Sequence, residues 1–481
     1  MENIARLYNG QAWKDTDGHT IRAHGGWMLQ QDGYYYWFGE DRTDGKKVSC
    51  YRSSDLSCWE NRGAVLTLKS KVRPTYYRTS LEMYSPDQED IGYGQGAVIE
   101  RPKVLRNERT GKYVMWMHWE NGRDYHDARC AVATCDTIDG DYVYHGSFNP
   151  IGYMSRDCTV FQDDDGSAYF ISAARDNADL LVYRLSDDYL SIDEHVKTLW
   201  PGQYREAPAV MKRNGVYFLI TSACTGWLPN QGTYAYADSL TGKWSQLLPF
   251  GDSTTYDSQP AFIMPLQVQG KTEYLYVGDR WDPSSYHDST YVFLPLSFPM
   301  DKEMKVDWAD HFTLNHFTDS IENTLHSGMH RIKSCGAERY LAVQQTAGEE
   351  AAVNGKMLSY LAEEQKWIVE QAEDDGYVLF KNVFDGRYLA ASLSSDELPE
   401  GDGKVLLVQK GAHGCCCEWA LKDADDEGKI LIRNRMSGKV LSTRNRTGES
   451  LAHPSVHVEE AVEHDPRKGR DPQLFEILAV Y

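Results

Sequence analysis

The sequence predicts an all-β protein, and three observations lead to that prediction. A unit of polar residue, short strand, glycine turn and aromatic strand occurs five times in the first two thirds of the chain. The later units follow one another at roughly 50 residues, a spacing typical of β-propeller blades. Further along, the pattern changes to three repeats of a second kind. We therefore expect a five-bladed β-propeller over residues 1–315 and a second β domain over residues 316–481.

Each of the five units turns at a glycine that separates two strand-forming runs. Asp-Gly or Asn-Gly between such runs is a strong signal for a β-hairpin. Further strands are expected in each unit, such as Lys47 to Arg52. The glycines and the strands that follow them are Gly33 with Tyr34 to Phe38, Gly111 with Tyr113 to Trp116, Gly166 with Ala168 to Ile171, Gly215 with Val216 to Leu219, and Gly270 with Tyr274 to Val277.

A polar residue opens the first strand of each unit. In a propeller the first strand of a blade is the innermost, so equivalent positions on five inner strands should face one central pocket. An apolar strand follows each of these residues at once, which does not fit solvated turn residues. The five positions are His24, Glu100, Asp157, Glu206 and Gln259.

Several carboxylates in one pocket suit the hydrolysis of glycosidic bonds. One acid must deliver a proton to the leaving oxygen while another group activates water on the opposite face of the sugar. Like charges placed close together raise one pKa, and that group becomes the acid. The chain also has 31 Tyr and 13 Trp, whose rings can stack on sugars, although many of them must form the β core.

Charge and cysteine content exclude several classes of protein. A net charge of −21 argues against nucleic acid and anionic membranes as partners, because phosphate-binding surfaces need clustered Lys and Arg. No apolar stretch of about 18 residues is present, so no membrane-spanning helix is expected. The ten cysteines, with Cys415, Cys416 and Cys417 adjacent, show neither disulfide nor zinc spacing, so free buried thiols are expected.

The start of the chain, Met1 to Arg6, lacks the apolar core of a signal peptide. Together with the cysteines it predicts a cytoplasmic protein, or a secreted one from which a signal has been removed. No cofactor is expected. No metal is expected either, because no oxygen-rich calcium loop occurs, although a metal at the propeller centre near His24 is an alternative. The oligomeric state cannot be read from these features.

Residues 8–310 resemble glycoside hydrolase family 43, a family of five-bladed propellers with an inverting mechanism. Ser155-Arg156-Asp157 is similar to the motif whose aspartate orients the general acid and tunes its pKa. Arg205-Glu206-Ala207-Pro208 is similar to the motif of the general acid itself. Both motifs in blade order make the resemblance specific, whereas either alone would be weak.

The first inner strand departs from the family pattern. Ile21 to Trp27 holds His24 and no carboxylate, where most members have a general-base aspartate. The departure resembles the exo-β-1,3-galactanase branch, and so do Tyr36 to Glu40, Glu100 to Lys103 and Ser258 to Pro260.

The resemblance to this branch implies a role for each matching residue. Glu206 is then the general acid, Asp157 its modulator, and Gln259 the group that holds the attacking water. Glu40 and Glu100 would bind hydroxyls of the terminal galactose. Further candidates for sugar contact are Tyr125, Asn177, Thr225 and Trp227, of which Trp227 is either a stacking platform or a buried core residue.

Residues 316–481 resemble the ricin-type β-trefoil of carbohydrate-binding module family 13. In each of the three repeats a strand leucine is followed by an aromatic in a Q-x-W-like setting, and such aromatics are core residues in these trefoils. Asp385 is the one position suggestive of sugar binding. The leucines are Leu341, Leu389 and Leu441, and the aromatics are Trp367, Trp419 and Phe475.

The resemblance to the exo-β-1,3-galactanase branch implies an inverting, exo-acting glycoside hydrolase that releases galactose from the non-reducing end of β-1,3-galactan, the backbone of arabinogalactan. β-1,3-Galactan or a galacto-oligosaccharide is the expected partner. One alternative is an α-L-arabinofuranosidase or β-xylosidase of the same family, against which the missing first-blade aspartate argues. Another is a catalytically inactive glycan-binding propeller, against which the retained acid and modulator argue.

Overall fold

The computed structural model describes residues 7–75, 78, 83, 96–268, 270–312, 329–344, 353–359, 362–372, 374, 376–391, 403–409, 417–424, 429–443, 456–459, 461 and 471–479. Two compact units divide the chain, residues 1–281 with 289–323 and residues 282–288 with 324–481. The predicted domain boundary at residues 315 and 316 lies outside the described residues. Within the described ranges, no helix has the length and apolar character needed to cross a membrane.

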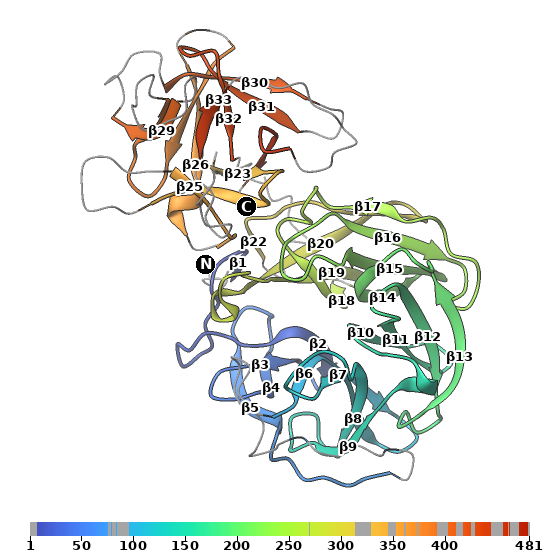
Figure 1. Cartoon of the computed structure of the whole chain (residues 1–481). Coiled ribbons are helices and arrows are strands. Elements are labelled where there is room, and N and C mark those ends of the chain that lie inside the picture. The colour runs from blue at the N-terminus through green and yellow to red at the C-terminus, as the bar shows by residue number, and fades with distance from the viewer. Residues whose placement is uncertain are drawn as a thin grey trace. The chain divides into compact units, whose positions relative to one another are not determined.

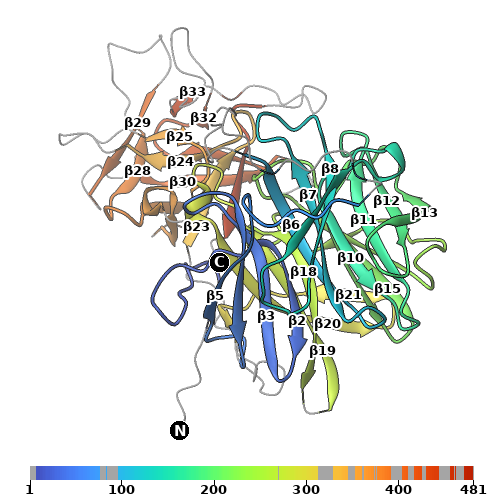
Figure 2. The same ribbon diagram turned by 90° about the horizontal axis from the view of Figure 1, so that it is seen from below.

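The first unit contains five four-stranded antiparallel sheets, each ordered from first strand to fourth in chain order. Figure 1 shows them following one another around a ring, and Figure 2 shows their strands along their length. The predicted five-bladed propeller is therefore confirmed.

The blades have the following bounds. Blades 1 and 2 comprise β2 (His24–Gln31), β3 (Tyr34–Asp41), β4 (Lys47–Ser53), β5 (Glu60–Thr67), β6 (Val98–Asn107), β7 (Lys112–Glu120), β8 (Arg129–Cys135) and β9 (Val143–Phe148). Blades 3 and 4 comprise β10 (Cys158–Gln162), β11 (Ala168–Ala174), β12 (Asp179–Leu185), β13 (Ile192–Leu199), β14 (Arg205–Arg213), β15 (Val216–Ala223), β16 (Gly232–Ala237) and β17 (Leu248–Phe250). Blade 5 comprises β18 (Gln259–Val268), β19 (Lys271–Arg280), β20 (Thr290–Met300) and β21 (Glu303–Val306). Short 3-10 turns lie at η1 (Pro150–Gly152) and η2 (Tyr286–Asp288).

The glycine turns join the first and second strands of each blade, as predicted. Asp32 and Gly33 have φ angles of 51° and 81°. Asn214 and Gly215 repeat the pair with 50° and 79°. Two successive left-handed residues form the type I′ turn that matches the twist of a hairpin, which explains why Asp-Gly and Asn-Gly occur here.

The ring closes between blades 5 and 1. Strand β1 (Leu7–Tyr8) pairs with β22 (His311–Phe312). The Asn9 side chain donates to Phe293 O at 3.0 Å and Ala309 O at 2.8 Å, and it accepts from Phe293 N at 2.8 Å. A buried aromatic cluster that includes Trp13 and Trp37 fills the interface between these blades. The first and last strands of the propeller, which lie far apart in sequence, are thus joined by backbone pairing, by the side-chain amide of Asn9 and by apolar packing.

The predicted free thiols are found in the first unit. Cys50, Cys130 and Cys158 are buried free cysteines, and burial raises the pKa of each thiol. Raised pKa values make such thiols poor nucleophiles. Cys415 and Cys416 lie outside the described residues.

The second unit contains a closed six-stranded barrel. Its strands pair in the cyclic order β23, β26, β27, β30, β31, β34 and back to β23. The remaining strands form three further antiparallel pairs, β24 with β25, β28 with β29 and β32 with β33. A barrel with three such pairs is the predicted trefoil arrangement.

The strands of the second unit have these bounds: β23 (Met329–Ser334), β24 (Arg339–Val343), β25 (Val353–Lys356), β26 (Trp367–Gln371), β27 (Val378–Asn382), β28 (Tyr388–Ala391), β29 (Gly403–Val408), β30 (Trp419–Asp423), β31 (Ile430–Asn434), β32 (Val440–Ser442), β33 (His457–Glu459) and β34 (Phe475–Ala479). A 3-10 turn, η4 (Glu363–Gln365), precedes β26.

The repeat aromatics lie in the trefoil core, as predicted. Trp367, Trp419 and Phe475 are fully buried in one apolar cluster. The Trp367 indole donates to Leu341 O at 3.1 Å, and the Trp419 indole donates to Leu389 O at 2.9 Å. Each tryptophan therefore binds the backbone of the leucine that marks its own repeat, and none of these aromatics is available to a ligand.

A close backbone contact in blade 1 positions one acidic residue. Gly39 lies in β3 against Ala23, and a Cβ atom at Gly39 would stand 2.0 Å from the carbonyl carbon of Ala23. Only glycine permits this approach. The next residue is Glu40, so the contact also sets where its carboxyl group lies.

We expect Gly39→Ala to lower the free energy of unfolding by about 3 kcal/mol or to prevent folding, because overpacking forces the backbone apart. The matched control is Gly33→Ala, where nothing lies within 4 Å of an added Cβ. The control should lose only about 1–2 kcal/mol, from its left-handed φ. Calorimetric unfolding measures both variants, and equal losses would contradict the close-contact explanation.

Candidate active site

Four of the five polar residues predicted at the inner strands line one pocket of about 380 Å³. Glu100, Glu206 and Gln259 lie near the beginning of β6, β14 and β18, and Asp157 directly precedes β10. The structure therefore brings these four side chains together. They come from four different blades.

A β-bulge follows the pocket glutamate at the start of β6 and of β14. The strand register shifts between Glu100 and Lys103 and between Glu206 and Ala209. The residues that follow the two glutamates, Arg101 and Ala207, have φ angles of 53° and 51°. A left-handed residue in a bulge re-aims its neighbours and strengthens the local twist. The prolines that follow in both motifs fit there, because bulged residues need no ladder N–H.

His24 does not line the pocket, so its predicted place there is wrong. Its side chain is fully buried, with Nδ1 3.2 Å from Asp279 Oδ1. The ring stacks on Tyr291 at a centroid distance of 4.5 Å. Burial lowers its pKa, which outweighs the opposite effect of Asp279. Blade 1 reaches the pocket through Glu40 of β3 instead.

Arg101 connects three of the inner strands. Its guanidinium lies 3.0 Å from Asp157 Oδ2. It donates to Gln259 Oε1 at 2.5 Å and to Pro260 O at 2.8 Å. Gly25 leaves room for it, since a Cβ there would lie 3.2 Å from Arg101 Cδ. One buried cation therefore sets the distance between the residues of blades 3 and 5.

Glu206 is an acid held in its protonated form. Burial, followed by the negative charge of Asp157, raises the pKa of Glu206 to about 8. Its Oε1 accepts from Gln259 Nε2 at 3.1 Å and its Oε2 accepts from Asn177 Nδ2 at 3.2 Å. Asp157 Oδ2 accepts from the backbone N of Ala207 at 3.1 Å. Asp157 thus positions the acid through its neighbour and acts on it through charge.

The amide of Gln259 can take one orientation only. Its Oε1 accepts from Arg101 and, at 2.8 Å, from Trp281 Nε1, and both of these groups can only donate. Its Nε2 donates to Glu206 and, at 3.0 Å, to Ser222 Oγ. A reversed amide would set its NH₂ group against two donors, so the carbonyl oxygen faces Arg101.

Two further carboxyl groups lie on the blade 1 and blade 2 side of the pocket. Arg42 Nη2 donates to Glu40 Oε2 at 3.1 Å and to Glu100 Oε1 at 2.7 Å. The Tyr125 hydroxyl donates to Glu100 Oε1 at 2.6 Å. Burial raises the pKa of Glu40 to about 8. Burial acts the same way on Glu100, but His118, Arg42 and Tyr125 outweigh it and hold the pKa of Glu100 well below its usual range.

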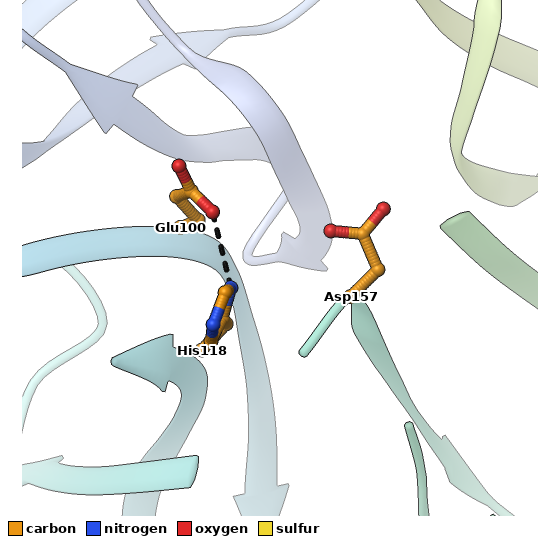
Figure 3. Close-up of side chains that lie close together, drawn as sticks. All are labelled: Glu100, His118 and Asp157. Carbon is orange, nitrogen blue, oxygen red and sulfur yellow. Dashed lines mark ion pairs between the residues drawn. The ribbon is translucent and has the colours of Figure 1, made fainter. Parts of the chain in front are cut away.

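Glu100, His118 and Asp157 have possible metal-ligand atoms within 4.8 Å of one another. Figure 3 shows the three side chains, with the ion pair between Glu100 and His118 dashed. They do not fit a metal ion. Arg42 and Arg101 already compensate the two carboxylates, and both ring nitrogens of His118 already face a carboxylate, Glu100 at one and Glu120 at the other.

Aromatic side chains form another wall. Trp227 lines the pocket and stacks on Trp281 with ring centroids 5.6 Å apart and planes 11° apart. Trp227 is therefore a pocket residue rather than a core residue. Asn177 and Tyr125 also line the pocket. Thr225 is not among its lining residues. Its hydroxyl donates to Leu228 O at 2.6 Å within its own loop.

Sequence reasoning missed Arg101, His118 and Trp281 as site residues. Arg101 stands inside the motif Glu100 to Lys103, but nothing in the motif shows that its side chain turns inward. His118 and Glu120 are alternate polar residues in an otherwise apolar strand, and that pattern could have identified a buried pair. Trp281 follows the end of β19 and carries no local signal.

The chain resembles sequence families over both units. The model of glycosyl hydrolases family 43 matches residues 21–250, and the model of the ricin-type β-trefoil lectin domain matches residues 363–453. A β-D-galactofuranosidase from Aspergillus niger is 35% identical over 96 residues, which is 20% of this chain and 27% of that protein. A putative β-xylosidase from Xylanibacter ruminicola is 30% identical over 123 residues, 23% of this chain and 24% of that protein. The chain thus spans about a quarter of the length of these two curated relatives.

Solved structures are similar over longer stretches. An exo-β-1,3-galactanase from Clostridium thermocellum is 37% identical, with 99% of this chain and 100% of that chain covered and a TM-score of 0.58. A putative exo-β-1,3-galactanase from Bifidobacterium bifidum is 32% identical, covering 64% of this chain and 97% of that one, with a TM-score of 0.54. An exo-β-1,3-galactanase from Phanerochaete chrysosporium, solved with β-1,3-galactotriose, is 27% identical, covers 98% and 92%, and has a TM-score of 0.58.

The contacts of Glu206 predict how its acidity responds to a change at Asp157. In Asp157→Asn the pKa of Glu206 should fall below about 8, because a neighbouring negative charge no longer opposes ionisation. Carbon-13 NMR of the glutamate carboxyls follows the titration, with Glu206→Gln used to assign the signal. The control is Asp176→Asn, whose carboxylate is 78% exposed and should leave the titration unchanged. An unchanged titration in Asp157→Asn would show that burial alone sets the acidity.

Proposed function

The chain belongs to glycosyl hydrolase family 43, and from that premise we propose that it is an exo-acting hydrolase that releases galactose from the non-reducing end of β-1,3-galactan. The support for this substrate is the similarity to solved exo-β-1,3-galactanases over nearly the whole chain. The observation that carries the proposal is the protonated Glu206 beside Asp157 and Gln259 in one pocket.

Glu206 serves as the general acid. Cleavage of a glycosidic bond needs a proton on the leaving oxygen as the bond breaks. With a pKa of about 8, Glu206 holds that proton at neutral pH, and Asp157 keeps it there by charge repulsion. Asn177 and Gln259 bind one oxygen each, which fixes the direction of the carboxyl group.

Gln259 positions water in its ordinary amide form. Basicity at nitrogen would require the imidic tautomer, which carries its proton on Oε1. That oxygen faces the donors Arg101 and Trp281, so an O–H there would be opposed by two N–H groups. The amide is scarcely basic, and the oxocarbenium-like centre of the transition state is electrophilic enough to react with a water that is held in place.

The remaining pocket groups suit a single terminal sugar. Glu40, Glu100 and Tyr125 offer hydrogen bonds to hydroxyl groups, and the Trp227 ring offers a face for the apolar side of the sugar. Exo action is proposed from the similarity to solved exo-β-1,3-galactanases.

An α-L-arabinofuranosidase, β-xylosidase or galactofuranosidase activity is the competing proposal. It is favoured by the names of the two curated relatives, whose alignments cover a quarter of this chain or less. Against it stands the first inner strand, which carries the buried His24 and contributes no carboxylate to the pocket.

We expect galactose to be the only monosaccharide released when β-1,3-galactan, arabinan and xylan are supplied in turn. Proton NMR of the first turnovers should show the α-anomer, the product of inversion at a β-linked sugar. Release of arabinose or xylose would support the competing activity, and initial β-galactose would contradict inversion.

In the same assay Glu206→Gln should lose at least about 10³-fold on galactan, because the leaving oxygen no longer receives a proton. An aryl galactoside with a good leaving group needs little protonation and should lose much less. Equal losses on the two substrates would remove Glu206 from the role of acid.

A carboxylate in place of Gln259 separates a positioning role from a basic one. We expect Gln259→Glu to lose most of its activity, because a new charge beside Asp157 disturbs the acid and competes for Arg101. Steady-state rates on galactan measure the effect. Gln259→Ala serves as the control, since it should also be inactive under either role. A Gln259→Glu enzyme as fast as the wild type would show that a base is what this position lacks.

A further inference from the structure

A buried histidine links the pocket to a second carboxylate behind it. The pairing of β6 with β7 sets His118 directly opposite Glu100. His118 Nδ1 lies 3.0 Å from Glu100 Oε2, and His118 Nε2 lies 3.0 Å from Glu120 Oε1. Glu120 comes two residues after His118, so both side chains are on one face of the strand. The three groups form a row that leads from the pocket into the interior of blade 2.

With Glu100 and Glu120 both ionised, this row favours a proton on each ring nitrogen. A neutral imidazole would turn one lone pair toward a carboxylate. Burial opposes the charged form, but Glu100 and Glu120 outweigh it and raise the pKa of His118 to about 9. His118 is only 2% exposed, and Glu120 is fully buried, so bulk solvent screens these charges little.

We propose that His118 is a positioning residue, a permanent imidazolium that keeps Glu100 ionised and fixed in the pocket. The proposal deepens the proposed galactan hydrolysis and rests on it for the role of Glu100. Arg42 and Tyr125 both donate to Glu100, and Glu40 shares Arg42 with it. Asp157 lies across the pocket, and Glu120 faces the other side of His118.

The consequence concerns the transition state. Glu40 and Glu206 have pKa values raised to about 8 and are largely neutral at pH 7. An ionised Glu100 therefore supplies negative charge near the sugar, where positive charge develops on the anomeric centre. It also accepts hydrogen bonds from sugar hydroxyls more strongly than a neutral acid would.

Glu120, the carboxylate behind His118, also anchors the loop that carries Tyr125. Glu120 Oε2 accepts from the backbone N of Ala128 at 3.0 Å, and Ala128 has a left-handed φ of 41°. Tyr125 lies in the same loop and returns to Glu100 through its hydroxyl. The contacts from Glu100 through His118 and Glu120 to the loop, and from Tyr125 back to Glu100, thus form a ring. Loss of the His118 charge should affect both Glu100 and Tyr125.

The first test needs no substrate. Proton–nitrogen NMR of the histidine rings in the full chain reports the protonation of His118, with His118→Gln used to assign its signals. Both ring nitrogens should remain protonated at pH 8. Loss of a proton below pH 7 would overturn the proposal, whether or not the protein proves to hydrolyse galactan.

The second test measures the pH dependence of kcat on an aryl galactoside. His118→Gln keeps a polar side chain but no charge, so the pKa of Glu100 should rise. The acidic limb of the pH–rate profile should therefore move to higher pH by about 1–3 pH units. Glu120→Gln should move the acidic limb in the same direction by a smaller amount. This variant replaces His118→Gln in the test if His118→Gln does not fold. KM should change less than kcat.

The matched control is His145→Gln. His145 is buried in the same blade, where its ring bonds to Thr134 Oγ1 at 2.7 Å and Arg73 O at 2.8 Å, and it does not line the pocket. This variant should lower stability and leave the acidic limb in place. An acidic limb unmoved in both His118→Gln and Glu120→Gln would overturn the proposal, and so would an equal movement in His145→Gln.

Discussion

The buried guanidinium of Arg101 is the constraint on which the rest of the pocket depends. A charge removed from water costs several kcal/mol unless partners surround it. Here Asp157, Gln259 and the Pro260 carbonyl supply those partners from blades 3 and 5. The left-handed backbone at Arg101 turns the side chain inward, and Gly25 leaves space for it. Asp157 and the Gln259 amide are therefore held by one cation, and a shift of either would take a partner away from a buried charge.

Around this cation, the pocket keeps similar carboxyl groups in different protonation states. Glu40 and Glu206 have raised pKa values because burial dominates. Glu100 is as deeply placed, yet Arg42, His118 and Tyr125 reverse the effect of burial. Environment alone thus divides chemically equivalent side chains into protonated and ionised groups within one pocket.

The second unit shows that a fold associated with sugar binding can be recognised without locating a sugar site. Trp367 and Trp419 are buried in the core, and their indoles donate to the backbone of their own repeats. Asp385, the one position that suggested a ligand, accepts from Nε and Nη2 of Arg387 at a single oxygen, Oδ2, at 2.9 and 2.7 Å. The repeat pattern therefore reports packing, and function has to be argued from individual sites.

The sequence by itself determined the five blades, the three-repeat second unit and the four pocket residues at the inner strands. Turn chemistry and strand alternation are local properties that recur with the repeat. Only the tertiary structure decided that His24 is buried, that Thr225 serves its own loop, and that Arg101, His118 and Trp281 belong to the site. The reason is physical. A bulge changes the face on which a residue lies, and the partners of Arg101 are up to 159 residues away. The charges that settle each protonation state therefore meet only once the ring of blades has closed.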